Sequence, residues 1–301
     1  MNATGKFAGF TVGLVVIFGA ALALGSVAGP DVAEPAAHTA EDDGHGATGH
    51  DTSSHDAVAD ATPGGLTPTA DGHTLELASD QVTAGAAVPV QFRITNPSGV
   101  PVTDYTVEHE KLLHLIVVRR DLAGFQHVHP TLDATGTWSV PLDLTRGGDY
   151  RVFADFTPAG GEGVTLGTDL RVAGTYDPQE LPAPAATATV DGYTVTLDGA
   201  LRPGETSNVT LSVSRDGQPV TDLQPYLGAY GHLVALRTTD LGYLHVHPDG
   251  HPGDGVTAAG PGIDFAVTAP SPGDYRLFLD FQHAGAVHTA EFTATAGPEE
   301  K

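Results

Sequence analysis

Cysteine is absent from the 301-residue chain, and its single methionine is Met1. Without thiols the chain forms no disulfide, and it offers no thiolate as a nucleophile or as a ligand for Cu(I) or an iron–sulfur cluster. Any metal site must therefore be built from nitrogen and oxygen donors. The 15 histidines supply the nitrogen donors.

Cations are also scarce, with 13 Lys and Arg against 37 Asp and Glu and a formal net charge of −24. This balance excludes a nucleic-acid-binding protein, which needs clustered cations for phosphate contacts. It also excludes a polybasic membrane-surface patch. No Ser-centred nucleophile elbow and no His-Glu-x-x-His motif occurs, so we do not expect an enzyme.

The N-terminal region 1–29 is predicted to be a transmembrane signal-anchor helix. Residues 7–29 carry no charge and are long enough to cross a bilayer. Lys6 precedes them and Asp31 follows, so the positive-inside rule places the rest of the chain outside the membrane. Ser26-Val27-Ala28 also fits a signal-peptidase site, and cleavage there would release a secreted protein.

Residues 30–65 are predicted to be a disordered His- and Asp-rich tether, because they show no apolar periodicity that could form a core. Two interpretations of this segment stay open: a solvated acidic spacer, or a tract that holds metal loosely. Its histidines are His38, His45, His50 and His55.

The remainder of the chain is an internal duplication. Gly148-Asp149-Tyr150-Arg151-Val152-Phe153, for example, recurs as Gly273-Asp274-Tyr275-Arg276-Leu277-Phe278. Short apolar stretches alternate with Gly, Pro, Asn and Asp, which predicts an all-β fold of two tandem immunoglobulin-like β-sandwiches. We expect domain 1 at 66–174, a Pro-rich linker at 175–185 and domain 2 at 186–297. The strands expected in domain 1 lie near 74–78, 87–95, 112–120, 124–128, 136–143, 149–156 and 164–172.

Tyr150 and Tyr275 each follow a Gly-Asp turn and open a strand, like the tyrosine corner of immunoglobulin-type sandwiches. We expect their hydroxyls to bond to backbone upstream. Val152 and Leu277 stand two residues further on, where a sandwich cysteine would lie, so apolar packing must replace the disulfide.

Three histidines recur in each repeat at a constant offset of 118. His114, followed by His127-x-His129-Pro130, matches His232, followed by His245-x-His247-Pro248. Residues i and i+2 of a strand share a face, and an antiparallel neighbour lies about 5 Å away. The pattern therefore predicts a three-imidazole metal site in each domain, and imidazole donors favour Cu(II) or Zn(II). Affinity should fall as the pH drops through about 6.5, the reference pKa of histidine.

Carboxylates and further histidines accompany these triplets. Asp155 in the first repeat and Asp280 in the second are predicted as ligands or as groups that orient a ligand. The second repeat adds candidate accessory ligands at His251, His283 and His288. The alternative stays open that each triplet is structural. His-x-His-Pro would then close the sandwich edge through hydrogen bonds, with His114 buried among Leu112, Leu115 and Ile116 and bonded to a backbone carbonyl, and the carboxylates would pair with Arg151 and Arg276.

The order of parts and the segments HEKLLHLIVVRRDLAGFQHVHP and LQPYLGAYGHLVALRTTDLGYLHVHP resemble a group of actinobacterial membrane-anchored or secreted proteins commonly labelled heavy-metal-binding. The resemblance covers nearly the whole chain and implies metal association.

Two functions are expected, and a metal-dependent enzyme resembling three-histidine hydratases is the least favoured third. The first is an extracytoplasmic, membrane-anchored protein that binds or handles Cu(II) or Zn(II). The alternative is a non-catalytic adhesion or sensor ectodomain in which the histidines are structural.

Overall fold

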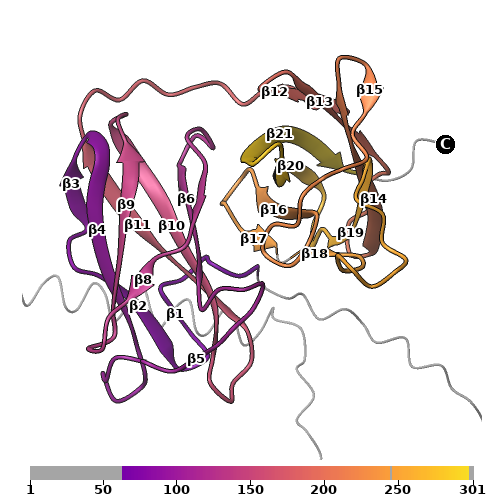
Figure 1. Cartoon of the computed structure of the whole chain (residues 1–301). Coiled ribbons are helices and arrows are strands. Elements are labelled where there is room, and N and C mark those ends of the chain that lie inside the picture. The colour runs from indigo at the N-terminus through magenta and orange to yellow at the C-terminus, as the bar shows by residue number, and fades with distance from the viewer. Residues whose placement is uncertain (1–62, 245, 298–301) are drawn as a thin grey trace, which may run out of the picture. The chain divides into compact units, whose positions relative to one another are not determined.

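A computed structural model describes residues 63–244 and 246–297 (Figure 1). Within these ranges every regular element is a strand, and no helix there is long and apolar enough to cross a membrane. The predicted anchor and the predicted tether up to residue 62 lie outside the described residues. The last tether residues are bound to the folded part, since Gly65 N–H donates to Thr165 O at 2.9 Å and Gly64 O accepts from Tyr243 N–H at 3.0 Å.

The first sandwich has a five-stranded sheet of order β1-β2-β4-β9-β8 and a six-stranded sheet of order β3-β11-β10-β6-β7, with β5 on β10. Its strands are β1 (Thr69–Ala70), β2 (His73–Leu77), β3 (Gln81–Thr83), β4 (Gly85–Thr95), β5 (Tyr105–Thr106), β6 (His114–Arg119), β7 (Gln126–Val128), β8 (Thr131–Leu132), β9 (Thr137–Leu144), β10 (Gly148–Pro158) and β11 (Val164–Ala173).

The second sandwich has a six-stranded sheet of order β12-β13-β14-β19-β18, with β15 on β14, and a four-stranded sheet of order β17-β16-β20-β21. Its strands are β12 (Thr187–Val190), β13 (Tyr193–Asp198), β14 (Thr206–Arg215), β15 (Gln218–Pro219), β16 (Gly231–Arg237), β17 (Tyr243–Leu244), β18 (His247–Pro248), β19 (Gly262–Thr268), β20 (Gly273–His283) and β21 (Ala286–Ala296).

The predicted fold class, two tandem immunoglobulin-like sandwiches, is confirmed in the described residues. All seven strands expected in the first repeat are present, as β2, β4, β6, β7, β9, β10 and β11. The short strands β1, β3, β5 and β8 were not expected, because two or three residues are too few to show an alternating pattern.

Each sandwich has its own apolar core. Phe92 and Trp138 stack in the first core at a ring-centroid distance of 6.2 Å. Val152 and Leu277, which stand at the sandwich-cysteine positions, are fully buried in the first and second core respectively. Aliphatic packing therefore fills the place where related folds carry a disulfide.

The two tyrosines have the hydrogen-bond geometry of a tyrosine corner. The Tyr150 hydroxyl donates to Arg146 O at 2.9 Å, and the Tyr275 hydroxyl donates to Ser271 O at 2.8 Å. Both rings are buried, and burial raises the pKa of the Tyr150 hydroxyl. Each tyrosine thus joins the start of its strand to the preceding turn.

A third apolar cluster lies between the sandwiches. β6 and β16 have unalternating apolar stretches, Leu-Ile-Val-Val and Leu-Val-Ala-Leu, because both faces of each strand are buried. One face of each strand packs in its own core, and the other contributes to the shared cluster. The members of this cluster are Ile116, Val118, Leu122, Phe125, Phe153, Val234, Leu236, Leu241, Tyr243 and Phe278.

Candidate metal site at the face between the sandwiches

Strand geometry places the histidine triplet of the first repeat on this shared face. His114 opens β6 and has the same parity as Ile116, which belongs to the shared cluster. β7 pairs antiparallel with β6, and His127 lies directly opposite Ile116. His129 follows two residues later. His114 is buried and bonded to a backbone carbonyl, as the structural alternative expects, and it lies on the same side of β6 as Ile116 and not as Leu115.

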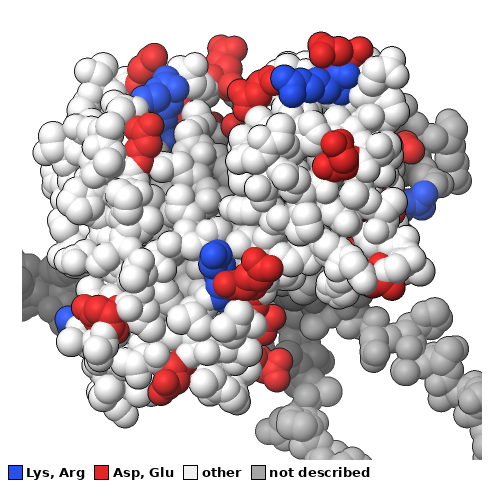
Figure 2. All heavy atoms as spheres, viewed as in Figure 1, with Lys and Arg blue, Asp and Glu red and all other residues white. Residues whose placement is uncertain are grey.

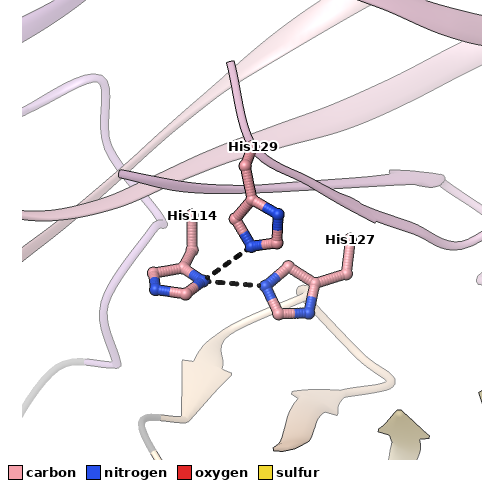
Figure 3. A group of neighbouring side chains, drawn as sticks. All are labelled: His114, His127 and His129. Atoms are coloured by element: carbon pink, nitrogen blue, oxygen red, sulfur yellow. Dashed lines mark hydrogen bonds between the residues drawn. The ribbon is translucent and has the colours of Figure 1, made fainter. Parts of the chain in front are cut away.

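The three imidazoles converge, as Figure 3 shows. Nδ1 of His114 lies 3.0 Å from Nε2 of His127 and 3.2 Å from Nε2 of His129. One nitrogen atom from each ring falls within 4.8 Å of the other two, and no other such group of metal-ligating side chains is found in 63–244 and 246–297. Nitrogen ligands of a tetrahedral Zn(II) are separated by roughly 3.3 Å, given Zn–N bonds of about 2.0–2.1 Å. The spacing is close to what a metal ion requires.

Outer hydrogen bonds fix the tautomers of two of these rings. His114 Nε2 lies 3.2 Å from the carbonyl of Glu108, which can only accept, so this nitrogen carries a proton and Nδ1 presents a lone pair when the ring is neutral. His127 Nδ1 donates in the same way to Asp280 Oδ2 at 2.8 Å. The facing atoms, His114 Nδ1 and His127 Nε2, then both present lone pairs unless a proton or a cation lies between them.

Burial favours the neutral form of two of the three imidazoles. Desolvation lowers the pKa of His114 to about 4 and that of His129 to about 3, and the neighbouring His127 adds to both effects. Protons therefore compete with a metal for these two rings only at a pH well below about 6.5, the value expected from the reference histidine pKa. Neutral imidazoles with convergent lone pairs are the form that binds a metal.

The two predicted carboxylates lie outside the ring of converging nitrogens. Asp155 accepts from the hydroxyls of Thr165 at 2.9 Å and Tyr243 at 3.2 Å. Asp280 accepts from Thr289 at 2.6 Å and from His127. Asp280 thus contacts one of the three converging histidines and is not itself a member of the group. Neither carboxylate is paired with Arg151 or Arg276, which bind Asp169 and Glu291 instead.

The second predicted triplet is described only in part. His245 lies outside the described residues, and of His247 only the backbone, in β18, is described. His232 repeats the arrangement of His114, since its Nε2 lies 2.9 Å from the carbonyl of Tyr226, the residue equivalent to Glu108. Burial lowers the pKa of His232 to about 4.

His109 lies at this site and was missed by the sequence analysis. Its ring centroid is 5.2 Å from that of His232 and 6.1 Å from that of His114. A tight turn of Glu108 to Lys111 presents it, with His109 at φ 47° and Glu110 at φ 64°. Its counterpart in the second repeat is Leu227, so the recurrence of histidines between the repeats does not include His109. Only the short sequence distance from His109 to His114 indicated that it could lie at the site.

The candidate accessory histidines are not brought to the triplet. His283 Nε2 lies 3.1 Å from Asp222 and its Nδ1 2.7 Å from the Tyr193 hydroxyl, while His288 Nδ1 lies 2.8 Å from Asp191. His251 is exposed in the loop before β19. The described atoms therefore assemble one three-histidine group.

Two cavities adjoin this group. One of about 30 Å³ lies among the imidazoles of His109, His114, His127 and His232, which is enough for a water molecule or an ion. Another of about 420 Å³ reaches His109 and His114 from the surface and is lined by the carboxylates of Glu108 and Glu162. Negative charge at this second cavity would attract a cation toward His114 of the triplet.

Basic side chains are dispersed among acidic ones. On the face in Figure 2 most of the blue side chains lie beside red ones. Ion pairs in the described residues include Arg120 with Asp169 and Arg171 with Asp80. This face carries no basic patch, in agreement with the charge balance of the chain.

The solved structures to which the chain is similar share little sequence with it. The Yersinia pseudotuberculosis adhesin InvE is 16% identical with a TM-score of 0.22, and the match covers 75% of this chain and 59% of that one. A putative membrane-anchored protein from Corynebacterium diphtheriae is 14% identical with a TM-score of 0.22, covering 77% of this chain and 60% of that one. The Ig1-2 module of the Drosophila receptor tyrosine phosphatase DLAR is 8% identical with a TM-score of 0.20, covering 75% and 99%.

No functionally curated protein matches the chain in sequence. A family model described as a domain of unknown function (DUF8832) matches twice, at residues 68–174 and 188–297. The two matches confirm the internal repeat, and together they cover most of the chain. The protein therefore belongs to this family and carries two copies of its domain.

Proposed function

We propose that the protein binds a divalent cation outside the cytoplasm, through His114, His127 and His129, as a non-catalytic metal-binding protein. The observation that carries the proposal is the convergence of three imidazole nitrogens, two of which have their tautomers fixed by hydrogen bonds on the opposite side of the ring. Outer partners of this kind are what orient the histidine ligands of metal sites.

The donor set favours Cu(II) or Zn(II). Both are borderline cations that imidazole suits, and the chain has no sulfur donor that would select Cu(I). Three protein ligands leave a fourth position of a tetrahedral ion open, for water or for a group delivered to the metal. The charge of −24 raises the local cation concentration and assists capture.

The location belongs to the same proposal. The uncharged stretch 7–29, flanked by Lys6 and Asp31, supports an N-terminal membrane anchor with the sandwiches outside. The resemblance to actinobacterial heavy-metal-binding proteins supports the same placement. Recovery of the chain in the washed membrane fraction would agree with an anchor, and a mature chain beginning near Gly29 in the medium would indicate a cleaved signal.

A specific observation favours a second candidate function. His127 and Asp280 join the two sandwiches through a hydrogen bond between side chains that are 5% and 4% exposed. In a non-catalytic adhesion or sensor ectodomain this pair would hold the sandwiches together, with a proton on His127 Nε2 where a metal would otherwise lie. The histidines would then be structural.

Metal analysis of the full chain separates the two functions. The purified protein, stripped with a chelator and titrated with Zn(II) or Cu(II), should bind one equivalent at the triplet, and the double variant His127→Ala with His129→Ala should lose that equivalent. His73→Ala, which removes an imidazole of the same sandwich outside the site, is the control. If the double variant keeps its metal stoichiometry but melts at a lower temperature, the histidines are structural.

A further inference from the structure

The three converging nitrogens all belong to the first sandwich, but the group that holds His127 in place belongs to the second. Asp280 lies on β20 and is 3% exposed. Its Oδ1 accepts from the Thr289 hydroxyl at 2.6 Å, which leaves Oδ2 to accept from His127 Nδ1 at 2.8 Å. The second sandwich therefore supplies a fixed acceptor to a ring of the first.

The two repeats contact each other reciprocally but not identically. Asp155 occupies in β10 the position of Asp280 in β20, and it likewise accepts from a cross-strand threonine, Thr165. Across the interface Asp155 accepts from, among other contacts, the Tyr243 hydroxyl at 3.2 Å. Phe125, which is equivalent to Tyr243, has no hydroxyl and stacks on Phe278 instead. Asp280 accepts across the interface from His127.

We propose that Asp280 is a positioning residue through which docking of the two sandwiches controls the metal affinity of the triplet. The inference rests on the proposed metal-binding function. When the second sandwich is docked, Asp280 fixes His127 with its Nε2 lone pair toward His114. When the second sandwich moves away, His127 loses this acceptor and is free to rotate or to change tautomer.

Coupling of this kind acts in both directions. Loss of an outer hydrogen-bond partner typically weakens metal binding about 10- to 100-fold. By linkage, a metal that binds the docked form more tightly by this factor strengthens docking by the same factor. Metal loading therefore strengthens an interface to which the shared apolar cluster and the hydrogen bond from Tyr243 to Asp155 also contribute.

Two variants of the full chain test the proposal, with Zn(II) as the probe in competition with a chromophoric chelator. Asp280→Ala should weaken Zn(II) binding about 10- to 100-fold. Asp280→Asn should weaken it less, because the amide oxygen still accepts from His127 Nδ1. Asp274→Ala is the matched control: it lies on the same strand, also accepts from a cross-strand threonine (Thr295 at 2.6 Å), and is distant from the triplet in register.

Hydrogen exchange distinguishes this coupling from a purely structural role of Asp280, which would not make amide exchange in the second sandwich depend on Zn(II). In the wild type, Zn(II) should slow amide exchange in β16 and β20, which contain none of the three ligands, and Asp280→Ala should abolish this protection. If Asp280→Ala does not fold, the Asp280→Asn variant carries both measurements. Zn(II) affinities within about threefold of wild type, with no Zn(II)-dependent protection of the second sandwich, would overturn the coupling but leave the metal site. Absence of Zn(II) binding by the wild type would overturn the proposed function and the coupling together.

Discussion

Phe125 of the first sandwich stacks face to face on Phe278 of the second, with ring centroids 4.0 Å apart and 5° between the planes. The equivalent residues in the opposite repeats, Tyr243 and Phe153, form the corresponding pair at 5.6 Å. The two sandwiches thus meet through the same face of each domain. The histidine triplet lies on the same face, because His114 has the same parity in β6 as Ile116 of the shared cluster.

Replacing Phe278 with Ala should loosen the interface without unfolding either sandwich. The ring is fully buried in the shared cluster, and Phe→Ala changes at such sites cost about 3–5 kcal/mol. Hydrogen exchange should accelerate in β6 and β16. Phe265→Ala, which removes a ring from the core of the second sandwich, should instead accelerate exchange throughout that domain. Identical patterns in the two variants would contradict this assignment of the interface.

The corner tyrosines should stabilise each sandwich through the hydrogen bonds of their hydroxyls, and the Tyr275 hydroxyl also accepts from Ser271 N–H at 3.3 Å. Tyr150→Phe and Tyr275→Phe keep the buried rings and remove only the hydroxyls that donate to Arg146 O and Ser271 O. Each change should lower the free energy of unfolding by about 1–3 kcal/mol, because a backbone acceptor loses its partner. Denaturant unfolding measures the loss. Unchanged midpoints in both variants would rule out a stabilising role for the corners.

The metal-free protein should lose stability as the pH falls from about 6.5 toward 4. Burial lowers the pKa of His114 and of His232 to about 4 and that of His129 to about 3, so these rings stay neutral in the folded state while the unfolded chain takes up protons. The unfolded state binds more protons in this window, and stability therefore rises with pH. Each unit of pKa difference corresponds to about 1.4 kcal/mol.

Unfolding midpoints measured in chelator at pH 7.5, 6.0 and 5.0 test this dependence. The double variant His114→Asn with His129→Asn should show a shallower decline, since two of the responsible groups are gone. Equal slopes for the variant and the wild type would show that the buried histidines do not cause it.

Acidic side chains at the surface cavity should speed metal capture. Glu108 and Glu162 are exposed and line the cavity that reaches His114. Replacing both with Gln should slow Zn(II) association at low ionic strength by about tenfold or less, and added salt should remove the difference. Glu180→Gln, an exposed carboxylate outside this cavity, is the control for net charge. Equal association rates at low salt would exclude this path.

Sequence patterns were sufficient for the sandwiches and insufficient for the site. Alternating apolar residues, Gly-Asp turns and the duplication predicted the architecture, because these features report local backbone geometry and one buried face. The recurrence of His114, His127 and His129 identified the candidate ligands. His109 escaped notice because a turn, and not a strand pattern, brings it beside them.

The sequence by itself predicted that His127 and His129 lie on one side of the backbone, since residues two apart on a strand do, although β7 ends at Val128 and His129 follows it. Only the tertiary structure decided what covers that face. The second sandwich packs on it and brings Asp280 to His127 across 153 residues of chain, and burial lowers the pKa of His114 and His129. Burial and long-range hydrogen bonds depend on how the two domains pack against each other. The local sequence patterns from which strands are predicted contain no information on that packing.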